Sequence, residues 1–328
     1  PPLMGAGAFV MVELTGVPYT DIMFAALLPA VLFFLAVWVG IDAYATRYAL
    51  QGIPEDERPA RRDILITSAF FAVPFTVLLV GMFALKFTPQ YAASLAIFTG
   101  LAALLFNAKT GFDPKLGLSR LGDACLNAGR QIAMIGSIII CASIVIGVLG
   151  ITGLGVKLTS FIVSGAGGLL WPALLLTALA CLLLGMEVPT TAAYVICVSV
   201  AGPALIDLGL EPLQAHLFVF WFALLSTITP PVCGAVFIAA GMIGENWLRV
   251  ALSAMALGIG LYIIPLGMIA NPDIIRLQSD AGGAGVSFVQ MAIGLALISF
   301  GIISSHRAVL RVILFSSGLG LIFLRLIV

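Results

Sequence analysis

The sequence predicts an all-α polytopic membrane protein, on three observations. Hydrophobic residues make up 62% of the 328 residues and charged residues 9%, whereas about 25% of a soluble domain is charged. Apolar runs of roughly 20 residues, long enough to cross a bilayer as a helix, recur along the chain. The motif Pro-Pro-x-x-Gly occurs at residues 1–5 and 230–234, and each copy leads into an apolar segment. Because proline and glycine interrupt helices, the two copies predict broken membrane helices in a repeated, ion-transporter-type fold.

The apolar runs place the elements in order. Membrane spans are expected at residues 21–45, 64–85, 89–107, 131–163, 215–243, 248–269, 287–304 and 309–327. Residues 1–15 are expected to form the second half of a broken span. Residues 169–206 are expected to form a re-entrant hairpin that breaks at 185–190, and the glycine-rich stretch 150–155 is expected to interrupt the span around it. Residues 114–130 interleave apolar and charged side chains, which fits an amphipathic helix at the membrane interface or, alternatively, a plain connecting loop.

These elements divide the chain into five expected parts. They are the end of a first repeat at 1–46, scaffold spans at 47–107, the amphipathic helix at 108–130, a second repeat at 131–270 and a two-span tail at 271–328. Within the second repeat, the hairpin occupies 169–206 and the broken helix occupies 215–243. The first Pro-Pro copy stands at residue 1, so the hairpin that completes the first repeat is expected upstream of it.

Loop charges orient the expected spans. When the expected spans cross the membrane in alternating directions, eleven Lys and Arg residues fall on one side and four on the other. The positive-inside rule makes the side with eleven the cytoplasmic side. The first set is Arg47, Arg58, Arg61, Arg62, Lys109, Lys115, Arg120, Arg130, Arg249, Arg307 and Arg311, and the second is Lys86, Lys157, Arg276 and Arg325. The first Pro-Pro copy then leads outward and the second leads inward. Their opposite directions predict an inverted-topology repeat.

The hairpin break and the second Pro-Pro copy hold the densest polar groups of the apolar region. They read GMEVPTT at residues 185–191 and STITPP at residues 226–231. Within the hydrocarbon region, unwound backbone is stable only where it contacts protein or lines a water-filled cavity. Its carbonyl oxygens, which have no helical partner, and the threonine hydroxyls can then both serve as oxygen ligands. Hard cations such as Na⁺ take ligands of this kind, so the two breaks are expected to form one cation site between them. The alternative is that glycine, proline and threonine only kink and cap the helices.

Two features bear on the transported species. Half-helix N-termini at the breaks present free N–H groups and a positive dipole end, which suit an anionic substrate such as a carboxylate. Glu187 lies at a break within an apolar run, where it is expected to ligate a cation, carry a proton or contact substrate, or else to be solvated at the interface. His216 and His306 are expected to be interface residues near span ends. The cysteines lack metal-ligand spacing and catalytic motifs are absent, so no enzyme, cofactor, transition metal or nucleic-acid partner is expected.

Two stretches resemble the large membrane subunit of TRAP transporters, the tripartite ATP-independent periplasmic transporters. Residues 182–244, with the motifs PTTAAY, AHLFVF and TPPV, resemble its second repeat, and residues 1–30 resemble its first repeat just after the first hairpin. The likeness is to the DctM-like region of the fused type, in which the small and large membrane subunits form one chain. It extends over about residues 1–270, and the last two spans resemble the variable tail of fused members.

The resemblance implies a Na⁺-driven, elevator-type importer in a bacterial or archaeal cytoplasmic membrane. A periplasmic binding protein, of the TAXI type for fused members, would deliver organic acids such as dicarboxylates, and a small membrane subunit or its fused equivalent would complete the permease. The implied second-half ion site consists of Gly185, Val188, Pro189, Thr190, Thr191, Thr227, Thr229, Pro230 and Pro231. The implied first-half site is present only in part, as Pro1, Pro2 and Gly5, so one complete ion site is expected. Fused members commonly have a small residue where this chain has Glu187, which leaves the ion and its stoichiometry open.

Two other functions remain open on the sequence alone. A carboxylate symporter driven by Na⁺ or H⁺ could share the inverted-repeat plan without a binding protein, and its uptake would persist when the binding protein is removed. A non-transporting membrane enzyme or assembly subunit is the second alternative. An enzyme of this kind would need a nucleophile–base pair or metal ligands in the spans, and the sequence has neither pattern.

Overall fold

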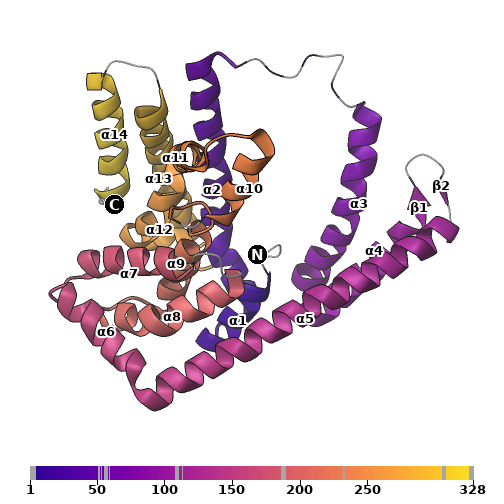
Figure 1. The fold of residues 1–328 in the computed structure, drawn as a ribbon, viewed down its shortest axis with the longest axis horizontal. Helices are drawn as coiled ribbons and strands as arrows, with labels where there is room; N and C mark the ends of the chain where they lie inside the picture. The colour runs from indigo at the N-terminus through magenta and orange to yellow at the C-terminus, as the bar shows by residue number, and fades with distance from the viewer. Residues whose placement is uncertain are drawn as a thin grey trace. The chain divides into compact units, whose positions relative to one another are not determined.

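The computed structural model describes residues 5–50, 60–107, 111–112, 114–185, 190–231, 233–304 and 308–324, together with residues 52, 54 and 58. The described secondary structure is helical apart from two strands of two residues each, which confirms the predicted all-α class (Figure 1). Contacts along the chain define two compact units. The first combines Pro1–Leu50 with Ile138–Val328, and the second is Gln51–Ser137.

Three helical segments of the described residues are long and apolar enough to cross a membrane. They are α2 (Tyr19–Tyr48), the segment Asp63–Ala84 and α13 (Ala281–Ile303). A fourth crossing is possible if the bent pair α10 (Gly234–Ile243) and α11 (Trp247–Leu257) forms one span. Large apolar side chains point outward from α2, where Phe34 is 69% and Trp38 73% exposed. Such an outward apolar surface is typical of a helix that faces lipid, so the chain is a multi-pass membrane protein.

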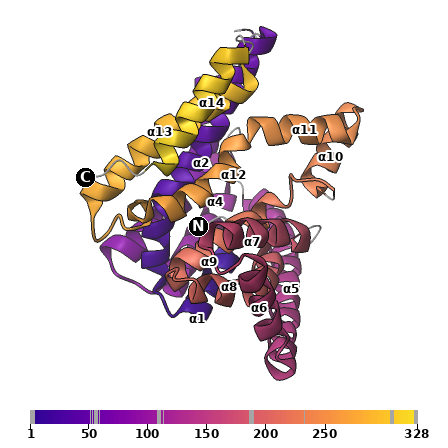
Figure 2. The same ribbon diagram turned by 90° about the vertical axis from the view of Figure 1, so that its left-hand side faces the viewer.

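The first unit is built around a core shared by its two halves. Its remaining helices are α1 (Gly5–Thr15), α6 (Leu154–Gly165), α7 (Leu170–Leu184), α8 (Thr190–Asp207), α9 (Pro212–Leu225), α12 (Ile259–Ala270), η3 (Pro272–Ile275) and α14 (Ala308–Phe323). Helix α8 packs against α6, α7 and α9, whereas α2 packs against α12 and α13 (Figures 1 and 2). The fully buried residues Leu32, Leu174, Phe218, Ile264 and Leu295 belong to one continuous apolar cluster.

Small residues let the helices of this unit approach closely. A Cβ atom added to Gly260 of α12 would lie 2.7 Å from the Cβ of Ala36 in α2. A Cβ on Gly318 of α14 would lie 2.6 Å from the carbonyl oxygen of Gly294 in α13, and one on Gly301 would lie 2.8 Å from the backbone nitrogen of Phe315. Close backbone approach at small residues is the usual basis of helix association in membranes. It holds α13 and α14 together as a tight hairpin.

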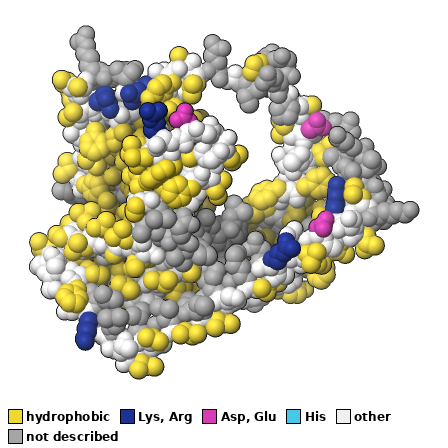
Figure 3. Space-filling view, viewed as in Figure 1, with side chains coloured by type: hydrophobic (Ala, Val, Ile, Leu, Met, Phe, Trp, Pro, Cys, Tyr) yellow, Lys and Arg dark blue, Asp and Glu magenta, His cyan; other side chains and the backbone are white. Residues whose placement is uncertain are grey.

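Two arginines cap the end of α13. Arg311 donates from Nε to the Gly301 carbonyl at 3.0 Å and from Nη2 to the Ile302 carbonyl at 2.6 Å, and Arg47 donates from Nη1 to the Ile303 carbonyl at 3.0 Å. These carbonyls are among the last of α13 and lack partners within the helix, so cationic side chains both satisfy them and oppose the helix dipole. Lys and Arg side chains gather at this end of the unit in Figure 3, above a mostly apolar flank.

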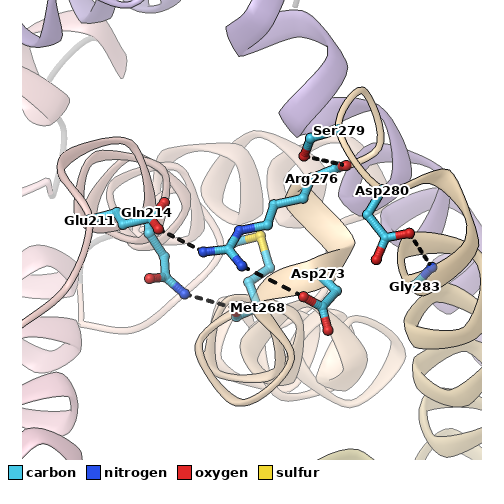
Figure 4. A network of polar contacts seen from close by, with 8 residues as sticks. All are labelled: Glu211, Gln214, Met268, Asp273, Arg276, Ser279, Asp280 and Gly283. Carbon is cyan, nitrogen blue, oxygen red and sulfur yellow. Dashed lines mark hydrogen bonds and ion pairs between the residues drawn. The ribbon is translucent and has the colours of Figure 1, made fainter. Parts of the chain in front are cut away.

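A second polar network lies where α13 begins. Arg276 pairs with Glu211 at 2.7 Å and with Asp273 at 3.8 Å, and Asp280 accepts a hydrogen bond from the Gly283 backbone N–H at 3.0 Å (Figure 4). Asp280 is the residue before the first turn of α13, and Ile303 is its last residue. A helix of 23 residues is about 34 Å long, close to the thickness of a hydrocarbon core. Arg276 therefore lies at the opposite end of α13 from Arg47 and Arg311, as the charge count predicts.

The second unit consists of a helix pair and the first part of a long helix. Helix α3 (Arg61–Leu79) continues through the π-helical turn η2 (Val80–Ala84), and α4 (Pro89–Leu104) packs back against both. The antiparallel strands β1 (Phe106–Asn107) and β2 (Gly111–Phe112) follow, and α5 (Pro114–Thr152) then runs into the first unit. The helices expected at 64–85 and 89–107 are therefore confirmed.

The structure corrects two expected helix boundaries. The amphipathic stretch 114–130 is helical, not a plain loop, but it continues without interruption into the span expected from residue 131, because α5 contains no proline after its first residue. The expected break near 150–155 is confirmed, since α5 ends at Thr152 and Gly153 has a φ of +65°. The span expected at 248–269 is divided at Gly258, which ends α11 and precedes α12.

Candidate functional site

The hairpin breaks where the sequence predicts. Helix α7 ends at Leu184, Gly185 closes its last turn by donating its N–H to the Cys181 carbonyl at 2.9 Å, and α8 begins at Thr190. The two arms touch where the fully buried Cys197 donates from Sγ to the Cys181 carbonyl oxygen at 3.8 Å. Residues 186–189 lie outside the described residues, so the predictions for Glu187, Val188 and Pro189 have no structural counterpart, and Thr190 is placed by its backbone alone.

The broken helix ends in three hydroxyl groups that turn back on it. Ser226 donates to the Ala223 carbonyl at 2.6 Å, Thr227 to the Leu224 carbonyl at 2.9 Å, and Thr229 lies 2.7 Å from the Leu225 carbonyl oxygen. These are terminal carbonyls of α9, and those of Leu224 and Leu225 also accept the backbone N–H groups of Thr227 and Ile228 at 3.3 Å and 3.2 Å. The expected capping role is therefore present. It leaves the hydroxyl oxygens available as ligands, because a hydroxyl has one donor hydrogen and two lone pairs.

The hairpin break and the broken helix are direct neighbours. A Cβ atom on Gly185 would lie 2.6 Å from Ser226 Oγ and 3.0 Å from Ser226 Cβ. Ser226 is fully buried, and Thr191 in the first turn of α8 is 9% exposed. Only a residue without a side chain fits at position 185, so the glycine lets the end of α7 contact the end of α9. The structure thus brings together Gly185 and the serine–threonine turn that the sequence singles out.

Tyr262 is a neighbour of the broken helix that the sequence analysis missed. Its hydroxyl oxygen, on α12, lies 2.7 Å from Thr229 Oγ1. On the adjacent residue, the Leu261 carbonyl accepts a hydrogen bond from Trp221 Nε1 of α9 at 2.9 Å. A tyrosine within an apolar helix and separated from the motif in sequence gives no periodic or spacing signal, so only the fold reveals this contact.

His216 is buried, which corrects the expectation that it is an interface residue. It is 7% exposed in the second turn of α9, and its Nδ1 lies 2.7 Å from the hydroxyl of the fully buried Tyr194 in α8. The pair joins the second arm of the hairpin to the helix that leads into the Pro-Pro break. His306 lies outside the described residues.

The two Pro-Pro copies lead into matching local structures. Helix α1 begins at Gly5 and α10 at Gly234, the glycines of the two motifs, and each helix is followed by a glycine in the left-handed region, Gly16 with φ +69° and Gly244 with φ +70°. Phe9 and Phe237, which lie four and three residues after the two motif glycines, each meet the aromatic residue that opens the next helix. The ring centroids of Phe9 and Tyr19 are 4.6 Å apart, and those of Phe237 and Trp247 are 5.2 Å apart.

The first Pro-Pro copy belongs to the same unit as the second. Helix α1 packs against α8 and α9, and a Cβ on Gly7 would lie 2.6 Å from Cε2 of Phe220. Pro1 and Pro2, named from the sequence as parts of a first site, lie outside the described residues, and Gly5 is the first residue of α1. The described residues therefore place α1, which follows the first Pro-Pro copy, beside the second arm of the hairpin.

The donor set at the break is made of neutral oxygens. Among the described residues there is no group of three His, Cys, Asp or Glu side chains that could hold a metal ion. The available groups are hydroxyls of Ser226, Thr227 and Thr229 with the backbone around them. Such a set suits a weakly held monovalent cation that is carried and released, and it does not suit a resident transition metal.

Comparison with known proteins identifies a family. The family model described as "Tripartite ATP-independent periplasmic transporter, DctM component" matches residues 1–279. The match includes both Pro-Pro copies, the hairpin α7–α8 and the broken helix, and it ends before α13. A search of curated proteins finds no match to the chain.

Proposed function

The chain belongs to the DctM family of membrane components of tripartite ATP-independent periplasmic transporters, and from this premise we propose that it imports organic acids by Na⁺ symport. Membership makes it the membrane component of a secondary transporter, not an enzyme, and implies a periplasmic binding protein and a small membrane subunit as partners. The proposal adds the coupling ion, the substrate class and the mechanism of movement.

The contact between the two breaks is the observation that carries the Na⁺ proposal. Gly185 at the end of α7 meets Ser226 at the end of α9, and Thr227 and Thr229 follow within the same turn. The proposed ligands are the hydroxyls and carbonyl oxygens of this turn together with residues 188–191 of the hairpin. Neutral oxygens are the ligands that unwound membrane helices offer to Na⁺ in secondary transporters.

The helix directions support an anionic substrate. Helix α8 begins at Thr190 directly after the hairpin break, and α10 begins at Gly234 directly after the Pro-Pro break. Both N-termini direct unpaired N–H groups and positive dipole ends back toward the broken segments. A carboxylate bound there would need no lysine or arginine, which agrees with the absence of both residue types from α7 to α10 in the sequence.

An elevator mechanism gives these elements their roles. In the proposal, the hairpin α7–α8 and the broken helix α9–α10 move as the transport unit, while the helices of residues 47–107 and the amphipathic start of α5 form the scaffold. The binding protein, of the TAXI type in this proposal, delivers an organic acid to the outer face of a bacterial or archaeal cytoplasmic membrane. Na⁺ and substrate then cross together on the moving unit.

Uptake into proteoliposomes tests the proposed function. The permease, reconstituted with its small membrane subunit, is supplied with the binding protein and a radiolabelled organic acid that the binding protein retains. We expect uptake only when an inward Na⁺ gradient and the binding protein are both present. Uptake that follows a proton gradient and ignores Na⁺ would contradict Na⁺ coupling and favour Glu187 as a proton carrier. Uptake that persists without the binding protein would favour an independent carboxylate symporter.

A further inference from the structure

Tyr262 contacts the side chain of Thr229 from outside the broken helix. Its hydroxyl oxygen lies 2.7 Å from Thr229 Oγ1, and the same Oγ1 atom lies 2.7 Å from the Leu225 carbonyl oxygen. Thr229 belongs to the Pro-Pro break, whereas Tyr262 belongs to α12, which packs against α2 and α13. The contact therefore ties the break to the helices that surround it.

The hydrogen count fixes the direction of this contact. A threonine hydroxyl has a single hydrogen, and a backbone carbonyl can only accept, so the bond to Leu225 uses the hydrogen of Thr229. Tyr262 must then donate its own hydrogen to Thr229 Oγ1. Of the two lone pairs on Thr229 Oγ1, one receives this hydrogen and the other stays available. Two hydrogen bonds thus orient the remaining lone pair of Thr229 in one direction.

We propose that Tyr262 is a positioning residue of the cation site, whose hydroxyl holds the free lone pair of Thr229 Oγ1 toward Na⁺. The proposal rests on the proposed function, since it deepens the Na⁺ site at the same break. Without the tyrosine hydrogen, Thr229 can rotate about its side-chain bond or lose its hydrogen bond to Leu225, and the cation loses a preorganised ligand. The expected signature is weaker Na⁺ affinity with an unchanged maximal rate at saturating Na⁺.

The neighbouring contact supplies a matched control. Trp221 Nε1 donates to the carbonyl of Leu261, the residue before Tyr262, so Trp221→Phe loosens the same α9–α12 attachment without touching Thr229. A general weakening of this attachment would affect both variants alike. A role in positioning Thr229 would affect Tyr262→Phe alone, and it would be absent when Thr229 is already replaced.

The experiment measures Na⁺ half-saturation of uptake in proteoliposomes for wild type, Tyr262→Phe, Trp221→Phe, Thr229→Val and the double variant Tyr262→Phe/Thr229→Val. We expect Tyr262→Phe to raise the half-saturating Na⁺ concentration roughly 3- to 10-fold, the range for loss of one hydrogen bond, at an unchanged maximal rate. Trp221→Phe should match wild type, and the double variant should match Thr229→Val. Na⁺-dependent thermal stabilisation of the purified proteins gives the same comparison without transport.

The outcomes separate this proposal from the proposed function. Wild-type uptake without Na⁺ dependence would refute Na⁺ coupling and this proposal with it. If wild-type uptake depends on Na⁺ and Tyr262→Phe has the same half-saturating Na⁺ concentration as wild type, only the role of Tyr262 is overturned. Three further results would show that Tyr262 has only a structural role and would also overturn the proposal. They are an equal rise of the half-saturating Na⁺ concentration in Tyr262→Phe and Trp221→Phe, additive effects in the double variant, and loss of folding confined to Tyr262→Phe.

Discussion

Replacing Gly185 by alanine is expected to raise the Na⁺ concentration for half-maximal uptake about 5- to 100-fold. The added methyl group would lie 2.6 Å from Ser226 Oγ and 3.0 Å from the Cys181 carbonyl oxygen, so the end of α7 must move away from the end of α9. Overpacking of this kind typically costs about 1–3 kcal/mol, and about 1.4 kcal/mol corresponds to a tenfold change in affinity. Na⁺ titration of reconstituted uptake measures the effect.

Two further variants test whether the clash is the cause. Gly241→Ala in α10 is the matched control, because a Cβ there has no neighbour within 4 Å, and it should behave as wild type. Adding Ser226→Gly to Gly185→Ala removes Ser226 Oγ and Cβ and leaves only the contact with the Cys181 carbonyl oxygen, so this pair should recover part of the thermal stability lost in Gly185→Ala. An unchanged Na⁺ affinity in Gly185→Ala would separate the two breaks functionally, and no recovery of stability in the pair would show that the contact with Ser226 is not the cause.

The combined replacement Thr190→Ala/Thr229→Ala is expected to weaken Na⁺ dependence by about tenfold or more without loss of folding. Each substitution removes a proposed hydroxyl ligand, and losing one partner of a charged group costs roughly 1.5–3 kcal/mol. The Na⁺ concentration for half-maximal uptake measures this effect, and the elution profile of the purified variant measures folding.

Ser199→Ala provides the control for hydroxyl loss on the same hairpin arm. Ser199 lies on α8 with Thr190, but its hydroxyl donates to the Val195 carbonyl within the helix at 2.7 Å, away from the break. Its removal should leave Na⁺ affinity unchanged. If the double threonine variant titrates like Ser199→Ala, neither threonine hydroxyl belongs to the ion site.

The breaks could be predicted because their causes are local. Glycine tolerates left-handed backbone, which accounts for the helix end at Thr152 before Gly153. Proline removes a backbone donor, and Pro189 and Pro230 follow within five residues of the helix ends at Leu184 and Leu225. The repeat also has local markers, since each copy places a glycine at a helix start and a phenylalanine four residues or fewer beyond it. The two charge clusters at opposite ends of α13 follow from the count of loop arginines.

What the sequence did not reveal depends on distant contacts. Tyr262 meets Thr229 across 33 positions, and no spacing rule links a tyrosine in α12 to a turn after α9. The burial of His216 depends on Tyr194 in another helix, which periodicity within α9 does not report. A change from charged to apolar composition near residue 130 predicts a boundary, but α5 runs through it because no residue there ends a helix.

The central claim is that the hairpin break and the Pro-Pro break bind Na⁺ together, and Na⁺-dependent thermal stability of the purified protein tests it most directly. Unfolding in detergent is followed over a Na⁺ titration at constant ionic strength, with K⁺ as the replaced ion. Na⁺ at about 100 times its dissociation constant should stabilise the wild-type protein by about 2.7 kcal/mol, and a tenfold loss of affinity in Thr190→Ala/Thr229→Ala should reduce this stabilisation to about 1.4 kcal/mol or less at the same Na⁺ concentration. An equal Tm with K⁺, or an undiminished Na⁺ shift in that variant, would contradict the claim.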